Sequence, residues 1–146
     1  PQRVVSREVH QRLMRRFADA LAQGDFAGMK SMLADTAVLM GDGGGYVTSF
    51  PRPMVGGPRI AQLLFAATLR HKDALRIELA RINGQYAVLR YIGDELESAQ
   101  SYESDGERIT RVHVQRNPEK LARLVAALAQ RPVRRQLEAS APHESL

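Results

Sequence analysis

The chain has 146 residues, 44% of them hydrophobic and 25% charged, which suits one domain with a substantial core and excludes wholesale disorder. The absence of cysteine excludes disulfides, thiolate metal sites and a cysteine nucleophile, and it fits a reducing compartment. The net charge is +5, but the 21 lysines and arginines are scattered along the chain and aromatic residues make up 5%, so neither a nucleic-acid patch nor a base-stacking platform is indicated.

Two helices are predicted at the N-terminal end. The first spans residues 6–23, because apolar residues recur every four positions at Val9, Leu13, Phe17 and Leu21. Ser6 can cap this helix and Gly24 can end it. Asp25 is placed to cap a second, short helix over residues 26–33.

A carboxylate followed by three glycines interrupts the chain after the second helix, in the stretch Asp42, Gly43, Gly44, Gly45 and Tyr46. Glycine loses more backbone entropy on folding than other residues, so such a run indicates a positive φ or a close backbone approach. The flanking stretches 37–40 and 46–50 are strand-like, which predicts a tight, distorted connection between strands. A phosphate cradle is the alternative, but the spacing of the P-loop and of the dinucleotide fingerprint is absent.

The middle of the chain changes from helical to alternating periodicity. Two prolines predict an extended, irregular stretch over residues 50–54, and a third helix is predicted to begin at Pro58 and to end near His71, a helix-end cation. Alternation then predicts four consecutive antiparallel strands, starting at 75 and covering 85–92, 95–102 and 107–115. Residues 83–84 are Asn-Gly, a hairpin signal, and the phase of Ile109 predicts a bulge near Thr110.

A final helix is predicted to open at Asn117, Pro118, Glu119, Lys120 and Leu121. Asn117 is the expected cap, Pro118 the first helical position, and Glu119 meets the positive end of the helix dipole. We therefore expect one domain over residues 1–130 and a loose C-terminal tail over 131–146.

These elements define an α+β protein with a cone-shaped fold. A curved antiparallel sheet is expected to pack against the three N-terminal and central helices, with the C-terminal helix added at the end. Such a sheet can leave a cavity between its concave face and the helices, where a ligand would bind.

The sequence also resembles a known family through five stretches that occur in the family's order: Ala-Gln-Gly-Asp at 22–25, Asp-Gly-Gly-Gly at 42–45, Arg-Pro-Met-Val-Gly at 52–56, Ile-Asn-Gly-Gln at 82–85 and Asn-Pro-Glu-Lys-Leu at 117–121. Over about residues 9–124 the chain is similar to the SnoaL-like C-terminal extension of one group of extracytoplasmic-function sigma factors. The family pattern has a basic residue after its Asp-Gly-Gly-Gly and an aspartate in its Asn-Pro-Asp-Lys-Leu. Tyr46 and Glu119 stand at those positions, so a cation and any contact it makes are lost, whereas the helix-start charge is kept.

The resemblance implies a nuclear-transport-factor-like cone that acts as a fused regulator of an RNA polymerase sigma factor. It implies contact with the sigma core domains, through candidate residues Asp42, Gly43, Gly44, Gly45, Tyr46, Asn117, Pro118, Glu119, Lys120 and Leu121. The predicted elements leave no segment for a promoter-reading helix-turn-helix, so we expect no direct nucleic-acid readout, and the chain is either a domain of a longer sigma factor or a stand-alone relative. No apolar run is long enough to span a bilayer and the N-terminus lacks a signal-peptide core, so we expect a cytoplasmic protein without membrane contact.

An enzyme is the alternative, because relatives of this fold include cyclases, isomerases and dehydratases that act on small apolar molecules. Such chemistry needs an acid–base pair in the cavity, which Asp42 with Tyr46, Tyr91 or His113 could supply. Histidines on strands and aspartates beside glycines are more commonly structural, so the regulatory interpretation is favoured. No metal site and no cofactor are predicted. The fold also allows a homodimer through the outer sheet face, and a small apolar ligand that is sensed in the cavity.

Overall fold

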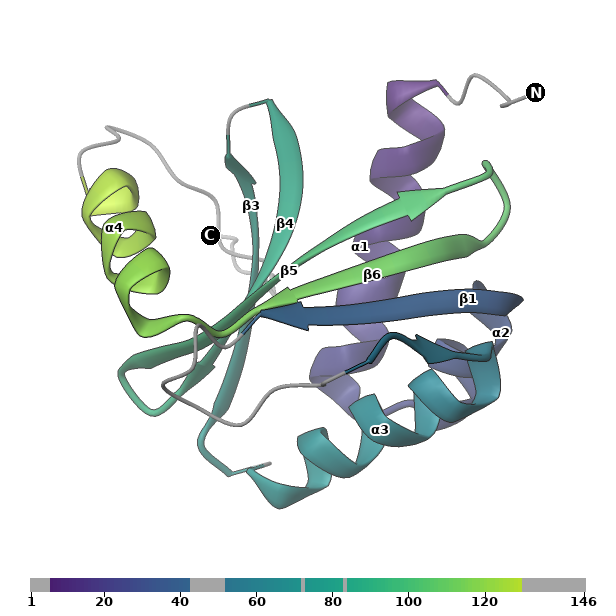
Figure 1. Ribbon diagram of the computed structural model, residues 1–146, viewed down its shortest axis with the longest axis horizontal. Coiled ribbons are helices and arrows are strands. Elements are labelled where there is room, and N and C mark those ends of the chain that lie inside the picture. The colour runs from purple at the N-terminus through teal and green to yellow at the C-terminus, as the bar shows by residue number, and fades with distance from the viewer. Residues whose placement is uncertain (1–5, 43–51, 72, 83, 130–146) are drawn as a thin grey trace, which may run out of the picture.

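A computed structural model describes residues 6–42, 52–71, 73–82 and 84–129 (Figure 1). Within these ranges four helices pack on a curved mixed sheet of six strands, ordered β2-β1-β6-β5-β4-β3. The helices are α1 (Arg7–Gln23), α2 (Phe26–Met32), α3 (Gly57–Arg70) and α4 (Pro118–Ala129). The strands are β1 (Leu33–Asp42), β2 (Met54–Val55), β3 (Leu75–Ile82), β4 (Gln85–Ile92), β5 (Glu95–Ser104) and β6 (Ile109–Gln115). The predicted α+β class is confirmed. The predicted tail over 131–146 lies outside the described residues.

The two N-terminal helices begin and end where the local chemistry predicts. The Ser6 hydroxyl accepts a hydrogen bond from the Val9 N–H at 3.1 Å, and the Asp25 carboxylate accepts one from the Gly28 N–H at 3.0 Å. Gly24 ends α1 in the left-handed conformation, with φ 68°, which glycine adopts without steric cost. Both predicted helices are therefore confirmed. The strand after them is longer than predicted, because β1 already begins at Leu33.

The predicted four-stranded meander is confirmed as β3-β4-β5-β6, with antiparallel pairing throughout. Glu103 lies opposite Arg111 and Ser104 lies opposite Ile109, so Thr110 is the extra residue of a bulge, as its phase predicts. The sheet is mixed and not wholly antiparallel, because β1 pairs with β6 in parallel.

The edge next to β1 is formed by a strand that the sequence did not indicate. β2 is antiparallel to β1, with Val38 opposite Val55 and Leu39 opposite Met54. Pro53 comes directly before this edge strand, where its missing N–H breaks no ladder. The strand-like stretch predicted over 46–50 lies outside the described residues.

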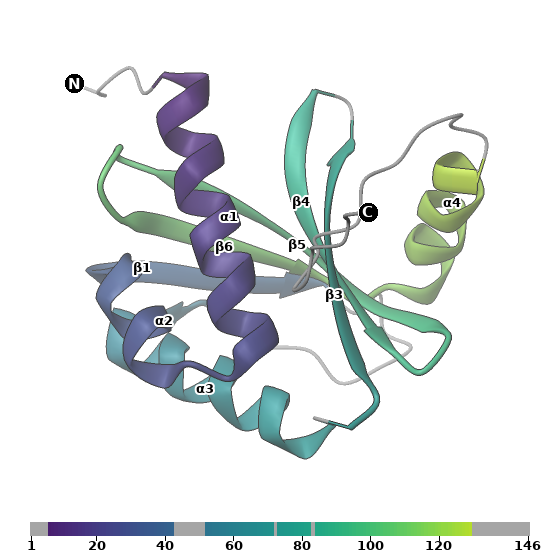
Figure 2. The same ribbon diagram turned by 180° about the vertical axis from the view of Figure 1, so that it is seen from behind.

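The sheet lies between α4 and the other three helices, as the views from front and back show (Figures 1 and 2), and an apolar cluster lies on each side of it. On one face, α1, α2 and α3 pack around Phe17, whose ring meets Tyr102 edge-on with centroids 5.3 Å apart. On the other face, here called the α4 face, Leu124 and Leu128 of α4 pack near Ala87, Leu89 and Ala99. Strands β3, β4 and β5 contribute side chains to both clusters, and α4 is separated from the other helices by the sheet.

No helix within the described ranges has both the length and the apolar character needed to cross a membrane.

Candidate functional site

The parallel pairing of β1 and β6 brings the strands that lead into the two sequence motifs side by side, at one end of the sheet. Met40 lies opposite His113, and Asp42 lies opposite Gln115. The C-terminal ends of parallel strands point the same way, so the strand that leads into the glycine run lies beside the strand that leads into α4. Residues Gly43, Gly44, Gly45 and Tyr46 lie outside the described residues, as does the side chain of Asp42.

The start of α4 has the chemistry that the sequence predicts. The Asn117 side-chain oxygen accepts hydrogen bonds from the Glu119 N–H at 2.9 Å and from the Lys120 N–H at 3.4 Å. Pro118 is the first helical residue, where its missing N–H has no consequence. Glu119 and Lys120 are exposed, whereas Leu121 is buried with 6% of its surface accessible. The first turn of α4 thus exposes the side chains of Glu119 and Lys120 to solvent and buries that of Leu121.

The junction before α4 is also tied to the neighbouring strands β5 and β4 by an ion-pair chain. Arg116 Nε lies 3.2 Å from one oxygen of Glu97, and the other oxygen accepts a 2.7 Å hydrogen bond from Arg90. Arg90 also donates to the Ala67 carbonyl of α3 at 2.6 Å. Glu97 is the extra residue of a bulge in β5, with no partner residue on β4, and this position lets its carboxylate contact both arginines. The α4 junction is therefore connected to α3 through one ion pair, between Arg116 and Glu97, and two charge-assisted hydrogen bonds from Arg90.

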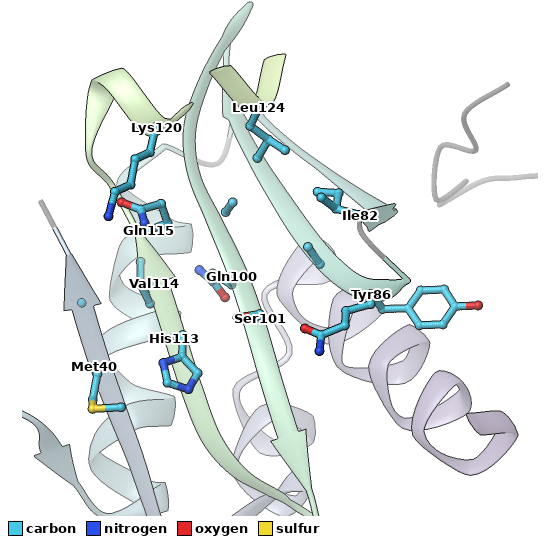
Figure 3. A pocket seen from close by; sticks show the side chains of 14 residues that line it. Met40, Ile82, Tyr86, Gln100, Ser101, His113, Val114, Gln115, Lys120 and Leu124 are labelled. Carbon is cyan, nitrogen blue, oxygen red and sulfur yellow. The ribbon is translucent and has the colours of Figure 1, made fainter. Parts of the chain in front are cut away.

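An open cavity of about 500 Å³ lies on the α4 face beside both motif segments (Figure 3). Its walls come from β1, β3, β4, β5, β6 and α4. The lining residues are Met40, Gly41, Ile82, Gln85, Tyr86, Ala87, Ala99, Gln100, Ser101, His113, Val114, Gln115, Lys120 and Leu124. Figure 3 shows Lys120 and Gln115 at one side of it and Leu124 and Ile82 at the other.

His113 and Tyr91, which the sequence analysis placed in a cavity, are not brought together. His113 lines the cavity on the α4 face, and its Nε2 lies 3.4 Å from the Glu103 carboxylate. On β4, the residue aligned with His113 across the sheet is Ala87, because both pair with Ser101 of β5. Tyr91 lies four residues further along β4; it is buried and is not among the residues that line this cavity. The Arg76 guanidinium lies 4.1 Å from its ring centroid. Tyr91 thus packs under a cation, whereas His113 faces solvent and the cavity.

A second cavity, of about 460 Å³, lies at the start of α1. His10 lines it and lies 3.1 Å from the Ser104 hydroxyl, and burial lowers the pKa of this imidazole from 6.5. Tyr102 also lines it; its hydroxyl donates to the Gln100 side chain, and burial raises the pKa of the phenol well above 10.0. The sequence analysis missed His10. His10 precedes the buried residues Leu13, Met14 and Phe17 by three, four and seven positions. This spacing puts it on the same helix face, toward the sheet, and is the signal that could have identified it.

The side chains of His113 and Glu103 are 41% and 62% exposed, so this ion pair lies at the surface of the protein. Among the described residues, no group of three or more His, Asp or Glu side chains could hold a metal ion.

No protein-family model and no curated protein matches the sequence. Solved structures do match. The extracytoplasmic function sigma factor SigJ of Mycobacterium tuberculosis has a TM-score of 0.63 and 19% identity, over 77% of this chain and 43% of that one. A SnoaL-like protein of unknown function from Burkholderia thailandensis has a TM-score of 0.57 and 15% identity, over 75% and 95% of the two chains. A putative polyketide cyclase from Sinorhizobium meliloti has a TM-score of 0.53 and 16% identity, over 71% and 94%.

These likenesses define the class: the chain has the α+β fold of SnoaL-like and NTF2-like proteins. The neighbours include a sigma factor and a putative cyclase, so the fold is shared by proteins of different function. The chain spans less than half the length of the sigma factor that it matches.

Proposed function

We propose that the chain is a regulatory domain of an extracytoplasmic-function RNA polymerase sigma factor, and that it adjusts transcription initiation by contacting the sigma core domains. One observation carries the proposal. The strands that lead into the two segments of the sequence resemblance, β1 ending at Asp42 and β6 ending at Gln115, pair side by side in parallel. If the glycine run were only a turn and the α4 motif only a helix start, the two would not need to be neighbours. If both contact the same partner, they must lie close together.

The surface at this end of the sheet has the character of a docking site. Glu119 and Lys120 are exposed on the first turn of α4, and Asn117 fixes their backbone. Leu121 and the ion-pair chain through Arg116 hold that turn on the sheet. Oppositely charged neighbours on a fixed turn favour orientation-specific contacts with a polar partner surface.

The sigma factor among the structural neighbours supports the same proposal. Its matching part covers 43% of its length, so most of that protein lies outside the likeness. In our proposal the partner of this chain is the equivalent remainder of its own sigma factor, docked on the end of the sheet formed by β1, β6 and α4.

The test is binding between this chain and the sigma core domains from the same reading frame, supplied as a separate protein and measured by calorimetry. We expect the double reversal Glu119→Lys with Lys120→Glu to weaken binding about tenfold, which is about 1.4 kcal/mol. The matched control is Lys30→Glu on α2, an exposed lysine on the other side of the sheet, which should leave binding unchanged. Absence of binding by the unmodified chain, or equal weakening by the control, would contradict the proposal.

A second candidate function is an enzyme of the isomerase, cyclase or dehydratase type, favoured by the cavity at the start of α1. There burial lowers the pKa of the His10 imidazole, which favours the neutral form of a general base, and it raises the pKa of the Tyr102 phenol, whose proton would have to turn from Gln100 to an oxyanion. The test is exchange of the α-protons of cyclohexenone for deuterium, followed by NMR. His10→Ala and Tyr102→Phe should each abolish an exchange that the unmodified chain catalyses, and no exchange above buffer would exclude this version.

A further inference from the structure

A third cavity, of about 430 Å³, lies between α2, the starts of β1 and α3, and the turn before β6. Its lining residues are Phe26, Ala27, Lys30, Ser31, Leu33, Asp35, Pro58 and Arg108. It shares none of them with the two cavities described above, and α2 lies on the opposite side of the sheet from α4 (Figure 2). Its volume falls within the range of roughly 300–1,000 Å³ that is typical of small-molecule sites.

One wall of this cavity is apolar. Phe26 of α2 packs against Phe65 of α3, with ring centroids 5.4 Å apart and the ring planes tilted by 58°. Leu33 is buried at the start of β1, and Pro58 stands in the first turn of α3. Phe26 itself is half-buried, so part of its side chain remains accessible from the cavity. A ligand with a large apolar group would bury that surface.

The rest of the lining carries charges of both signs. Lys30 of α2 and Arg108, which precedes β6, are cations, and Asp35 of β1 is an anion. Within the described ranges no ion pair joins any of these three side chains to another residue, so they line one cavity without neutralising one another. The Ser31 hydroxyl donates to the Gly28 carbonyl at 3.0 Å, and its oxygen can still accept a hydrogen bond.

We propose that this cavity binds an α-amino acid with a large apolar side chain. The carboxylate of the ligand pairs with Arg108 and Lys30. Its ammonium group pairs with Asp35 and donates to the Ser31 hydroxyl, while its side chain lies along the apolar wall. A carboxylate alone would leave Asp35 unmatched and an amine alone would leave both cations unmatched, so the charge pattern favours a zwitterion over either.

The experiment compares L-phenylalanine with three probes that each lack one of its groups. Phenylpropionate lacks the ammonium group, phenethylamine lacks the carboxylate, and glycine lacks the apolar side chain. Binding is followed by chemical-shift changes in the labelled full chain, and L-phenylalanine should perturb the amides of Lys30, Ser31, Asp35 and Arg108. Because the charged side chains are exposed, each pairing contributes modestly, and we expect L-phenylalanine to bind about fivefold more tightly than either single-charge probe, which is about 1 kcal/mol. Glycine should bind more weakly still, because it leaves the apolar wall exposed.

Two substitutions at exposed positions separate the two charges of the ligand. Asp35→Asn should weaken L-phenylalanine about fivefold without weakening phenylpropionate. Arg108→Gln should weaken both L-phenylalanine and phenylpropionate by about the same factor, without weakening phenethylamine. The matched control is Arg123→Gln, which removes an exposed arginine of α4 and should change the affinity for none of the probes.

Three results would overturn the proposal. They are equal affinity for L-phenylalanine and either single-charge probe, shift changes centred on the cavity beside Lys120 or on the cavity at the start of α1, and no binding up to about 20 mM L-phenylalanine. The proposal does not depend on the sigma-factor assignment, because this cavity lies away from the first turn of α4. Failure of the chain to bind sigma core domains would therefore leave these expectations unchanged.

Discussion

The cap of α4 offers a direct test of how this helix is held, through Asn117→Ala. α4 has 12 residues, close to the length at which an isolated helix is marginal in water. Only Leu121 and Leu128 of its side chains are buried, and the helix packs mainly against β5. Its first turn depends on the Asn117 side-chain oxygen, which accepts hydrogen bonds from two N–H groups. We therefore expect α4 to open locally at a lower free energy than the sheet beneath it.

Replacing an asparagine cap by alanine costs about 1 kcal/mol. Two buried leucines contribute about 1.5–3 kcal/mol each before the entropy of ordering the helix is subtracted, so the loss of the cap is a large part of the net docking free energy. A change of about 1 kcal/mol corresponds to a roughly fivefold increase in the open population of α4.

The assay is amide hydrogen exchange of the full chain. Asn117→Ala should accelerate exchange in α4 about fivefold and leave the amides of β4 and β5 unchanged, because the opening does not disturb the sheet. The matched control is Asp25→Ala, which removes the cap of α2 and should accelerate exchange in that helix alone. Equal acceleration of α4 and sheet amides in Asn117→Ala would mean that α4 opens only with the whole domain, and would refute the reasoning.

Three further predictions address the fold. Phe17→Ala removes a fully buried ring and should lower the free energy of unfolding in urea by about 3–5 kcal/mol; a loss near zero would mean that the core is not packed as described. Gly57→Ala places a Cβ 2.4 Å from the Ala34 carbonyl oxygen, so α3 must move away from β1, at about 1–3 kcal/mol in the same assay; an unchanged midpoint would exclude this close approach. His10→Gln tests the buried imidazole. Burial lowers its pKa from 6.5, so the unfolded chain takes up the proton first and stability is lost as the pH falls below 6.5. The variant should lose less stability than the unmodified chain between about pH 7.5 and 5.5, and identical slopes would contradict the shift.

Local chemistry is sufficient for much of this fold. Capping by Ser6, Asp25 and Asn117 depends on atoms within three residues of each cap, so the starts of three helices can be predicted directly. The meander follows from alternation and from turns between adjacent strands, and the bulge at Thr110 follows from a break in that alternation. For the site, the start of α4 could be predicted for the same reason, but its neighbours could not.

The amino-acid sequence by itself determined the four helices and the four strands of the meander, because caps, turns and periodicity act between residues that are close along the chain. Only the tertiary structure decided that β1 runs parallel to β6, that Met54 and Val55 extend the edge, and that α4 covers the opposite face from the other helices. Those arrangements depend on hydrogen bonds and apolar contacts between segments far apart in sequence. The cavity beside Lys120 and the parallel approach of the strands that lead into the two motifs are consequences of those long-range contacts.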